Sequence, residues 1–368
     1  MKPLTGIRSR VMAYASAALN VLDNVSSKPW SGLVIHSDLS GWVLDTEARG
    51  LLAACGKLNI PASLRNSAGR RKACVHYMTQ FTLLNPEVFF AGKDNRYSLA
   101  YFHGGPSEPG FGELFSRLLS LKNKISKVHV ANRAMDTALL ENGIAQECVA
   151  RIPIGINIEW FKPKTALSTE AVRKRLGIPS HAFVLGSFQK DGVGWGEGFD
   201  PKLIKGPDTL VDVCAALKKE IPGFRVLLSG PARGFVKKGL GAAGVPFTHV
   251  LCEHPHQVAE LYHALNVYAV TSRVEGGPKA VLESMATGVP LVTTEVGQAA
   301  DLVRHTVNGW MVKPGDVGGL VDGVMAVHRG SFGGAEVSAS ARATAEREDY
   351  VAQAPRWEKL FINGYVER

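Results

Sequence analysis

The segment TSRVEGGPKAVLESMATGVPLVTTEVGQAAD, residues 271–301, constrains the fold of this chain more than any other. Its pattern predicts a Gly-Gly-Pro turn, a helix over residues 279–287 that ends at Gly288, and a short buried strand over 291–294. An apolar strand over 267–271 leads into the turn. A strand, a helix and a second strand in this order form the crossover unit of a parallel sheet. We therefore expect an α/β fold.

The turn before this helix has the features of an anion site. Gly276 and Gly277 have no side chains, so a phosphate can approach the backbone closely. Pro278 has the fixed φ of a first helical position, and the helix then offers unpaired N–H groups and the positive end of its dipole. The backbone of Gly276, Gly277, Pro278, Lys279 and Ala280 is therefore predicted to hold a phosphate.

Two carboxylates lie on either side of this turn, eight positions apart. Glu275 stands in the loop at the mouth of the predicted site. Glu283 lies about one and a half turns into the helix, where a carboxylate can accept two hydrogen bonds from sugar hydroxyls. The segment therefore predicts a ligand with a phosphate at one end and a polyhydroxylated group at the other.

Two glutamates that enclose Gly-x-Pro in this way resemble the E-x7-E motif of the retaining family 4 glycosyltransferases. The segment ARIPIGINIEWFKP, residues 150–163, also resembles the interdomain connection of that family. The resemblance implies a GT-B fold, with two facing Rossmann-like doubly wound parallel-sheet domains, a cleft between them and a C-terminal helix that crosses back to the first domain. Without the resemblance, the same residues fit an ordinary crossover with solvated carboxylates.

A chain of 368 residues is long enough for two such domains. We expect an acceptor-side domain over 1–160, joined by a helix over 346–368, and a nucleotide-sugar-binding domain over 161–345. Short apolar runs predict the strands of both sheets. They cover residues 33–36, 74–78, 98–102 and 127–130 in the first domain, and 183–187, 224–229, 248–251, 267–271 and 291–294 in the second. The end of the chain has a helical pattern over 317–329 and 338–368.

Two candidate site residues follow predicted strands of the first domain. Gly41 lies in a strand–glycine-loop–helix opening, a common ligand loop of doubly wound sheets. His103 follows a strand end and precedes a glycine turn, where its ring could hydrogen-bond a hydroxyl or a phosphate. The resemblance implies that Gly41 lies against the donor phosphate and the acceptor, and that His103 faces the donor sugar or the acceptor. The alternative for His103 is an ordinary polar loop residue.

Two lysines of the second domain are candidate phosphate ligands. Lys205 precedes Gly206 and opens a helix, as a Lys-Gly pair does in the family. The family also has a Gly-Arg pair at the preceding strand end, where this chain has Ser187-Phe188-Gln189-Lys190. Lys190 is expected to replace that arginine as a point charge without bidentate geometry. Cations are needed here because cleavage of a sugar–diphosphate bond releases negative charge; otherwise Lys205 is a solvated helix-start residue.

The chain has a formal net charge of +9 and a pI near 9.3, which favour an anionic partner. Nucleotide, anionic membrane and nucleic acid are the options, and nucleic acid ranks last because no arginine-rich or aromatic-interleaved module is present. Membrane contact could involve a surface helix over 1–22 or the basic loop 64–72, although packing on the domain and simple solvation explain them equally. No apolar run approaches the roughly 18 residues of a membrane-spanning helix.

Five cysteines without a CxxC spacing fit a reducing, cytoplasmic location, with the inner membrane face as an alternative. The histidines at 249, 254 and 256 lie near Cys252, but a strand end and a proline separate them. There is no Asp-x-Asp pair to clamp a metal, so we expect neither a metal nor a cofactor.

We therefore expect a metal-independent retaining glycosyltransferase that moves a sugar from a nucleoside-diphosphate sugar to a hydroxyl acceptor. Its expected site residues are His103, Lys205 and Glu275 for catalysis, and Gly41, Lys190, Lys205, the 275–280 turn and Glu283 for the donor. Three other classes stay open. They are a GT-B phosphorylase, a Rossmann oxidoreductase that here lacks its GxGxxG motif, and a non-catalytic nucleotide-sugar or nucleic-acid binder.

Overall fold

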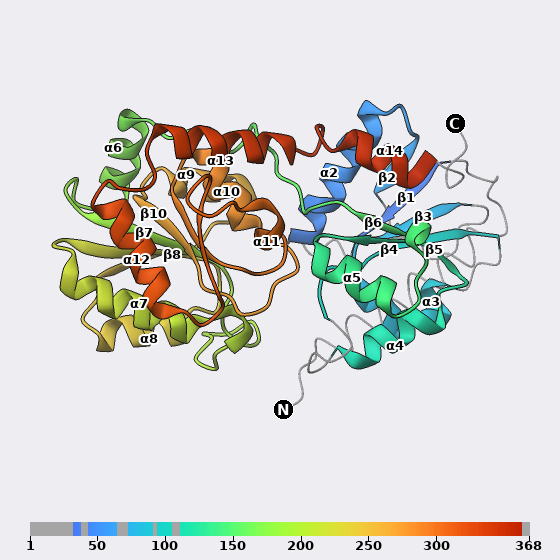
Figure 1. Ribbon diagram of the computed structural model, residues 1–368, viewed down its shortest axis with the longest axis horizontal. Helices are drawn as coiled ribbons and strands as arrows, with labels where there is room; N and C mark the ends of the chain where they lie inside the picture. The colour runs from blue at the N-terminus through green and yellow to red at the C-terminus, as the bar shows by residue number, and fades with distance from the viewer. Residues whose placement is uncertain (1–31, 38–42, 65–72, 91–93, 105–110, 363–368) are drawn as a thin grey trace. The chain divides into compact units, whose positions relative to one another are not determined.

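The computed structural model describes residues 32–37, 43–64, 73–90, 94–104 and 111–362 (Figure 1). Gly41, the predicted surface helix over 1–22 and all of the basic loop after Leu64 lie outside these residues. Contacts divide the chain into two compact units, Met1–Gly155 with Tyr350–Arg368, and Ile156–Asp349. The chain passes between the units after Gly155 and after Asp349, a few residues from the expected domain boundaries at 160/161 and 345/346.

The first unit is built on a six-stranded parallel sheet with the order β2-β1-β3-β4-β5-β6. Its strands are β1 (Leu33–His36), β2 (Ala62–Leu64), β3 (Cys74–Tyr77), β4 (Arg96–Ala100), β5 (Ile125–Val130) and β6 (Val149–Arg151). The four predicted strands are present, and β4 begins two residues earlier than expected. β2 and β6 were not predicted because three residues are too few to show a periodic pattern.

Helices cover both faces of this sheet (Figure 1). One face packs against α2 (Val43–Lys57) and α14 (Ala354–Ile362). The other packs against η1 (Gln80–Leu84), α4 (Gly112–Ser120) and α5 (Arg133–Glu141), with α3 (Pro86–Phe89) beside η1. The prediction that the last helix packs on the first domain is confirmed, because Trp357 of α14 is buried in that core.

The second unit has its own six-stranded parallel sheet, in the order β12-β11-β10-β7-β8-β9. Its strands are β7 (Phe183–Phe188), β8 (Phe224–Ser229), β9 (Phe247–Val250), β10 (Val267–Val270), β11 (Leu291–Thr294) and β12 (Trp310–Val312). Strands β8 and β9 are added in turn on one side of β7. The chain then crosses to the other side of β7, where β10, β11 and β12 follow in turn. The strand order therefore reverses between β7 and β10.

Helices cover both faces of this sheet as well. One face packs against α7 (Pro207–Glu220), α8 (Gly234–Ala242) and α12 (Val317–His328). The other packs against α6 (Ala166–Arg175), α9 (Pro255–Tyr262), α10 (Lys279–Thr287), α11 (Ala299–Leu302) and α13 (Ala335–Arg347). Both units are thus doubly wound Rossmann-like folds, as expected.

The prediction of one helical stretch from 338 to 368 is wrong. Helix α13 ends at Arg347 and α14 begins at Ala354, and the chain passes from one unit to the other between them. Pro355 lies in the first turn of α14, where a missing N–H is tolerated, and a continuous helix could not include it. On the first unit, Tyr350 donates a hydrogen bond of 2.5 Å to Glu47, which also accepts one of 3.1 Å from the Gly155 N–H.

Under α14, two histidines are buried between Trp357 and the sheet. The rings of His76 on β3 and His129 on β5 lie 6.0 Å apart, and that of His129 lies 4.7 Å from Trp357. The Nε2–H of His129 donates to the Ile152 carbonyl at 2.7 Å, and its Nδ1 has no hydrogen-bond partner among the described residues. Burial lowers the pKa of His129 to about 4 and that of His76 well below its ordinary value.

These histidines make the fold acid-sensitive. Between pH 6.5 and 4 the unfolded chain binds protons at these rings and the folded chain does not, so stability falls as the pH falls through this window. The shift at His129 corresponds to about 3 kcal/mol. Urea unfolding at several pH values should show a shallower pH dependence for His129→Gln than for the wild type. Identical slopes would contradict the assignment.

Candidate functional site

The candidate site lies at the point of the second sheet where the strand order reverses. Ligands of doubly wound sheets bind at the carboxyl ends of the strands beside such a switch point. Here the loop after β7 carries Lys190 and, further on, Lys205, and the loop after β10 carries Glu275. The topology therefore brings together loops that are far apart in the sequence.

Lys205 and Glu275 form an ion pair between these two loops. The Lys205 ammonium lies 2.6 Å from each carboxylate oxygen of Glu275, and Oε1 also accepts a hydrogen bond of 2.8 Å from the Ser272 hydroxyl. The Lys205 side chain is 24% exposed and that of Glu275 is 11% exposed. Both groups are held in place, yet the Lys205 side chain stays partly open to solvent.

The positions of both residues follow from contacts between their loops. Gly206 separates η3 (Leu203–Lys205) from α7 and has a φ of 61°, and a Cβ there would lie 2.0 Å from the Thr271 carbonyl oxygen. The Thr271 hydroxyl donates to the Gly206 carbonyl at 2.9 Å. Arg273 forms a bidentate pair with Asp208 at 2.8 and 2.7 Å. These contacts fix the turn that carries Lys205 against the loop that carries Glu275.

The turn before α10 has the predicted form with one difference. Helix α10 covers Lys279–Thr287 and ends at Gly288 in the left-handed conformation, as expected. Pro278 is the N-cap and not the first helical residue, because its ψ of 106° lies outside the helical range. Gly276 accepts a hydrogen bond of 3.1 Å from the Gln298 N–H, so the loop after β11 supports the turn from behind.

Glu283 on α10 is oriented by an aromatic cluster. The buried Tyr262 donates a hydrogen bond of 2.9 Å to its Oε2. The ring of Tyr262 packs at 5.0 Å from both Phe188 and Tyr268, and the Tyr268 hydroxyl accepts from the Phe188 N–H at 2.7 Å. Burial raises the pKa of Tyr262, so its proton is retained and the hydroxyl stays a donor. The cluster connects Glu283 to the end of β7.

Lys190, Lys202 and Lys205 form a group of cations after β7. The pKa of Lys202 is lowered, mainly because its ammonium is partly desolvated and also because the charges of Lys205 and Lys190 lie nearby. Lys190 has a different neighbour from Lys205, because its ammonium lies 4.3 Å from the centre of the Trp195 ring. The structure therefore brings Lys205 and Glu275 into contact, and places Lys190 on the aromatic side of the same loop.

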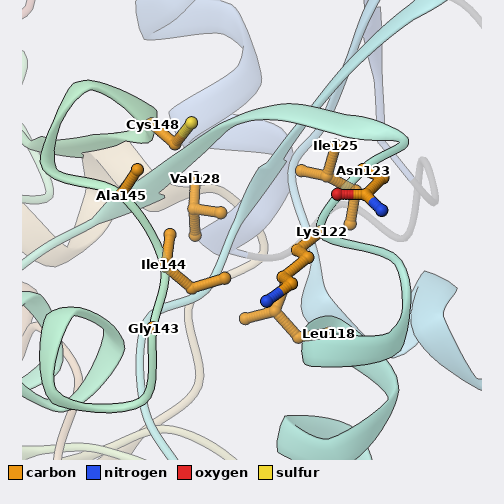
Figure 2. Close-up of a pocket in the computed structure, with 9 residues that line it drawn as sticks. All are labelled: Leu118, Lys122, Asn123, Ile125, Val128, Gly143, Ile144, Ala145 and Cys148. Carbon is orange, nitrogen blue, oxygen red and sulfur yellow. The ribbon is translucent and has the colours of Figure 1, made fainter.

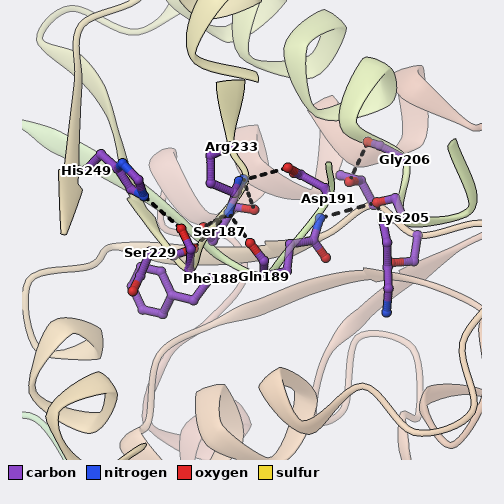
Figure 3. Close-up of polar contacts among 12 residues, drawn as sticks. Ser187, Phe188, Gln189, Asp191, Lys205, Gly206, Ser229, Arg233 and His249 are labelled. Atoms are coloured by element: carbon purple, nitrogen blue, oxygen red, sulfur yellow. Dashed lines mark hydrogen bonds and ion pairs between the residues drawn. The ribbon is translucent and has the colours of Figure 1, made fainter. Parts of the chain in front are cut away.

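Sequence reasoning missed the group that holds this loop (Figure 3). Arg233, after β8, donates to the carbonyls of Ser187, Gln189 and Ser229 at 2.7, 3.0 and 3.0 Å. Its Nε lies 3.1 Å from Asp191, and both side chains are 0% exposed. Gln189 in turn donates to the Lys205 carbonyl at 3.2 Å. In the sequence, Asp191 and Arg233 are only polar residues that follow two different predicted strands. Nothing in the sequence indicates that their side chains meet.

Of the two site residues predicted in the first unit, the structure describes His103, which contacts Gln80 and Phe111. The carbonyl of His103 accepts a hydrogen bond of 2.7 Å from Gln80, and its half-buried ring lies 4.9 Å from that of Phe111. A cavity of about 220 Å³ in the same unit lies near the amino end of β5, whereas His103 follows the carboxyl end of β4 (Figure 2). Apolar side chains form most of its wall, with Lys122 and Asn123 among the lining residues.

The three histidines near Cys252 do not converge. His249 bonds to the Gly230 carbonyl at 2.8 Å, while the rings of His254 and His256 stack 5.5 Å apart. Among the described residues, no group of three or more His, Cys, Asp or Glu side chains could hold a metal ion. No helix in the described part of the chain is long and apolar enough to cross a membrane.

The Arg233–Asp191 pair predicts a coupled effect on stability. Burial raises the pKa of Asp191, while the neighbouring Arg233 opposes this shift. Loss of one partner of a buried pair costs about 3–5 kcal/mol because the other charge stays buried. Arg233→Met should cost this much, and the double variant Arg233→Met/Asp191→Asn should cost less than the sum of the two singles in urea unfolding. Additive effects would show that the two side chains act independently.

Part of the second unit matches the model of a known family. Residues 200–343 match the model of the family described as "Glycosyl transferases group 1", which covers less than half of the chain. The matched residues include Lys205, Glu275 and Glu283, whereas Lys190 and His103 precede them.

Curated relatives resemble part of the chain. The D-inositol 3-phosphate glycosyltransferase of Corynebacterium urealyticum is 31% identical over 203 residues, which cover 50% of this chain and 44% of the relative. The lipopolysaccharide core biosynthesis mannosyltransferase LpsB of Rhizobium meliloti is 30% identical over 182 residues, 47% of this chain and 48% of the relative. The chain thus spans less than half the length of these relatives.

Solved structures match nearly the whole chain. The Anabaena protein HepE, solved in complex with UDP and glucose, has a TM-score of 0.71 at 18% identity and covers 90% of this chain and 99% of its own. This likeness shows the fold. The chain therefore has the two Rossmann-like units of the GT-B class, and its second unit carries the region that resembles the group 1 glycosyl transferases.

Proposed function

We propose that this protein is a retaining, metal-independent glycosyltransferase of family 4. It moves a sugar from a nucleoside-diphosphate sugar to a hydroxyl acceptor. The observation that carries the proposal is the Lys205–Glu275 pair at the switch point of the second sheet, within the region that matches the group 1 family. A fixed cation and a fixed carboxylate beside a glycine turn suit a ligand with a diphosphate and a sugar.

In this proposal the diphosphate lies on the backbone of residues 276–280. The Lys205 ammonium has three N–H donors, so it can bind a phosphate oxygen while it keeps Glu275 in place. Lys190 adds a second positive charge. These cations stabilise the negative charge that develops as the sugar–phosphate bond breaks, since fixed charges in a site that excludes water are worth several kcal/mol.

The two glutamates have different roles. Glu275 positions the donor sugar, because its carboxylate stands at the turn and is fixed by Lys205 and Ser272. Glu283 accepts hydrogen bonds from the ribose hydroxyls, with its orientation set by Tyr262. Both roles are hydrogen-bond acceptance, which an ionised carboxylate performs without a change of protonation.

The acceptor side belongs to the first unit. His103 and Gly41 are proposed to line it, and the departing phosphate is proposed to take the acceptor's proton, so that the configuration of the sugar is retained without an enzymic nucleophile. HepE was solved with UDP and glucose, so UDP-sugars are the first donors to test.

One observation favours a second candidate. The strand end that carries Gly-Arg in the resembling family has Lys190 directed at Trp195, and the nearby Arg233 is buried against Asp191. The chain lacks a guanidinium at this position and could bind a nucleotide sugar without transferring it. A GT-B phosphorylase, which would need orthophosphate as a substrate, is a weaker candidate.

Activity measurements separate these candidates. With a panel of UDP-, GDP- and ADP-sugars, the release of nucleoside diphosphate should depend on both members of the pair. We expect Glu275→Gln and Lys205→Met to lower the rate by about 100-fold or more, the usual effect of removing a group that stabilises developing charge.

The exposed Glu336→Gln serves as the matched carboxylate control and should react like the wild type. Wild-type rates in both site variants would contradict the assigned roles. Nucleotide binding without any release from any donor would favour the binder, and release that requires orthophosphate would favour the phosphorylase.

A further inference from the structure

The loop after β7 exposes an unusual number of large apolar side chains. Of the thirteen large apolar residues that are exposed in the described part of the chain, five lie within residues 193–204. They are Val193, Trp195, Phe199, Leu203 and Ile204, which are 52%, 60%, 62%, 54% and 36% exposed. Single exposed apolar residues are ordinary, but such a concentration marks an interaction surface. We call residues 193–204 the apolar loop.

The apolar loop is an ordered element. Gly192 and Pro201 form an antiparallel bridge at its base, and the Val193 N–H donates to the Asp200 carbonyl at 2.9 Å. Its far side is attached to the start of α8, where the N–H groups of Gly234 and Phe235 donate to the carbonyls of Glu197 and Gly198 at 2.7 and 2.9 Å.

The backbone of the apolar loop leaves its side chains little room on the protein side. Gly198 has a φ of 75°, and a Cβ there would lie 2.2 Å from the Ala232 carbonyl oxygen. Arg233, the residue after Ala232, is fully buried and pairs with Asp191. The loop therefore lies on a rigid support and directs its apolar residues outward, so little conformational entropy is lost when they bind a partner.

Exposed positive charges surround the apolar residues. Lys202 lies within the loop, and Lys238 is exposed on α8. Neither forms an ion pair with a described carboxylate. The loop has two exposed carboxylates, Glu197 and Asp200. Glu197 lies 3.9 Å from the Lys237 ammonium, which offsets its charge. The Lys190 ammonium lies over the Trp195 ring, 4.3 Å from its centre, so a further positive charge borders the apolar side chains.

The composition of this surface selects the kind of partner. Sugars stack on aromatic rings, but Val193, Leu203 and Ile204 are aliphatic and offer a sugar no hydrogen bonds. Tryptophan beside lysine is typical of the membrane–water interface, where the ring sits at head-group depth and the ammonium binds lipid phosphates. We propose that the apolar loop docks the protein on the surface of an anionic lipid bilayer. This proposal does not rest on the proposed sugar transfer.

Vesicle co-sedimentation of the full chain tests the proposal. Wild-type protein should sediment with vesicles of phosphatidylglycerol and phosphatidylcholine in equal parts, and far less with pure phosphatidylcholine. The double variant Trp195→Ala/Phe199→Ala should lower the partition coefficient by about tenfold or more, since binding scales with the apolar area inserted. Lys202→Glu should weaken binding to the anionic vesicles only.

Trp160→Ala is the matched control, because Trp160 is 40% exposed in the same unit and lies outside the loop. It should bind vesicles like the wild type, and unfolding curves check that every variant is folded. The proposal is overturned if wild-type protein stays in the supernatant, or if the double variant still sediments fully, which would place membrane contact elsewhere in the chain. Trp195-dependent dimers without vesicle binding would equally overturn it, in favour of a protein partner.

Discussion

The candidate site depends on the close contact between the turn at Gly206 and the strand end at Thr271. A side chain at position 206 would collide with the Thr271 carbonyl, so the backbones meet only because glycine stands there. This contact brings Lys205 to Glu275 across 70 positions of sequence. Opposite charges at 2.6 Å in a partly desolvated site attract strongly, but they were brought together by the fold of the loops and not by their own attraction.

A second buried pair supports the first. Arg233 satisfies three carbonyl groups at the ends of β7 and β8, and Asp191 compensates its charge. Through Gln189, the same strand end is bonded to the Lys205 carbonyl. The loop after β7 therefore combines an inner face that fixes the lysines with an outer face that is apolar.

Local signals explain what could be predicted from the sequence. Helix α10 was predicted with the right bounds because Pro278 marks its start and Gly288 marks its end. Five of the six strands of the second unit were predicted, because runs of four to six residues are long enough to show a pattern, whereas the three-residue β12 was missed. The break at residues 348–353 was missed because α13 and α14 have similar helical periodicity, and only Pro355 marks a boundary. The Arg233–Asp191 pair was missed because its members meet only through the order of the strands.

The most direct test of this account is a thermal-shift measurement with UDP, GDP, ADP, dTDP and CDP in the presence of EDTA. A ligand at 100 times its Kd stabilises a folded protein by about 2.7 kcal/mol, which raises the melting temperature by several degrees for a domain of this size. The account predicts such a shift with at least one nucleotide, and its loss in Lys205→Met. No shift with any nucleotide would contradict a metal-free nucleoside-diphosphate site at the switch point of the second sheet.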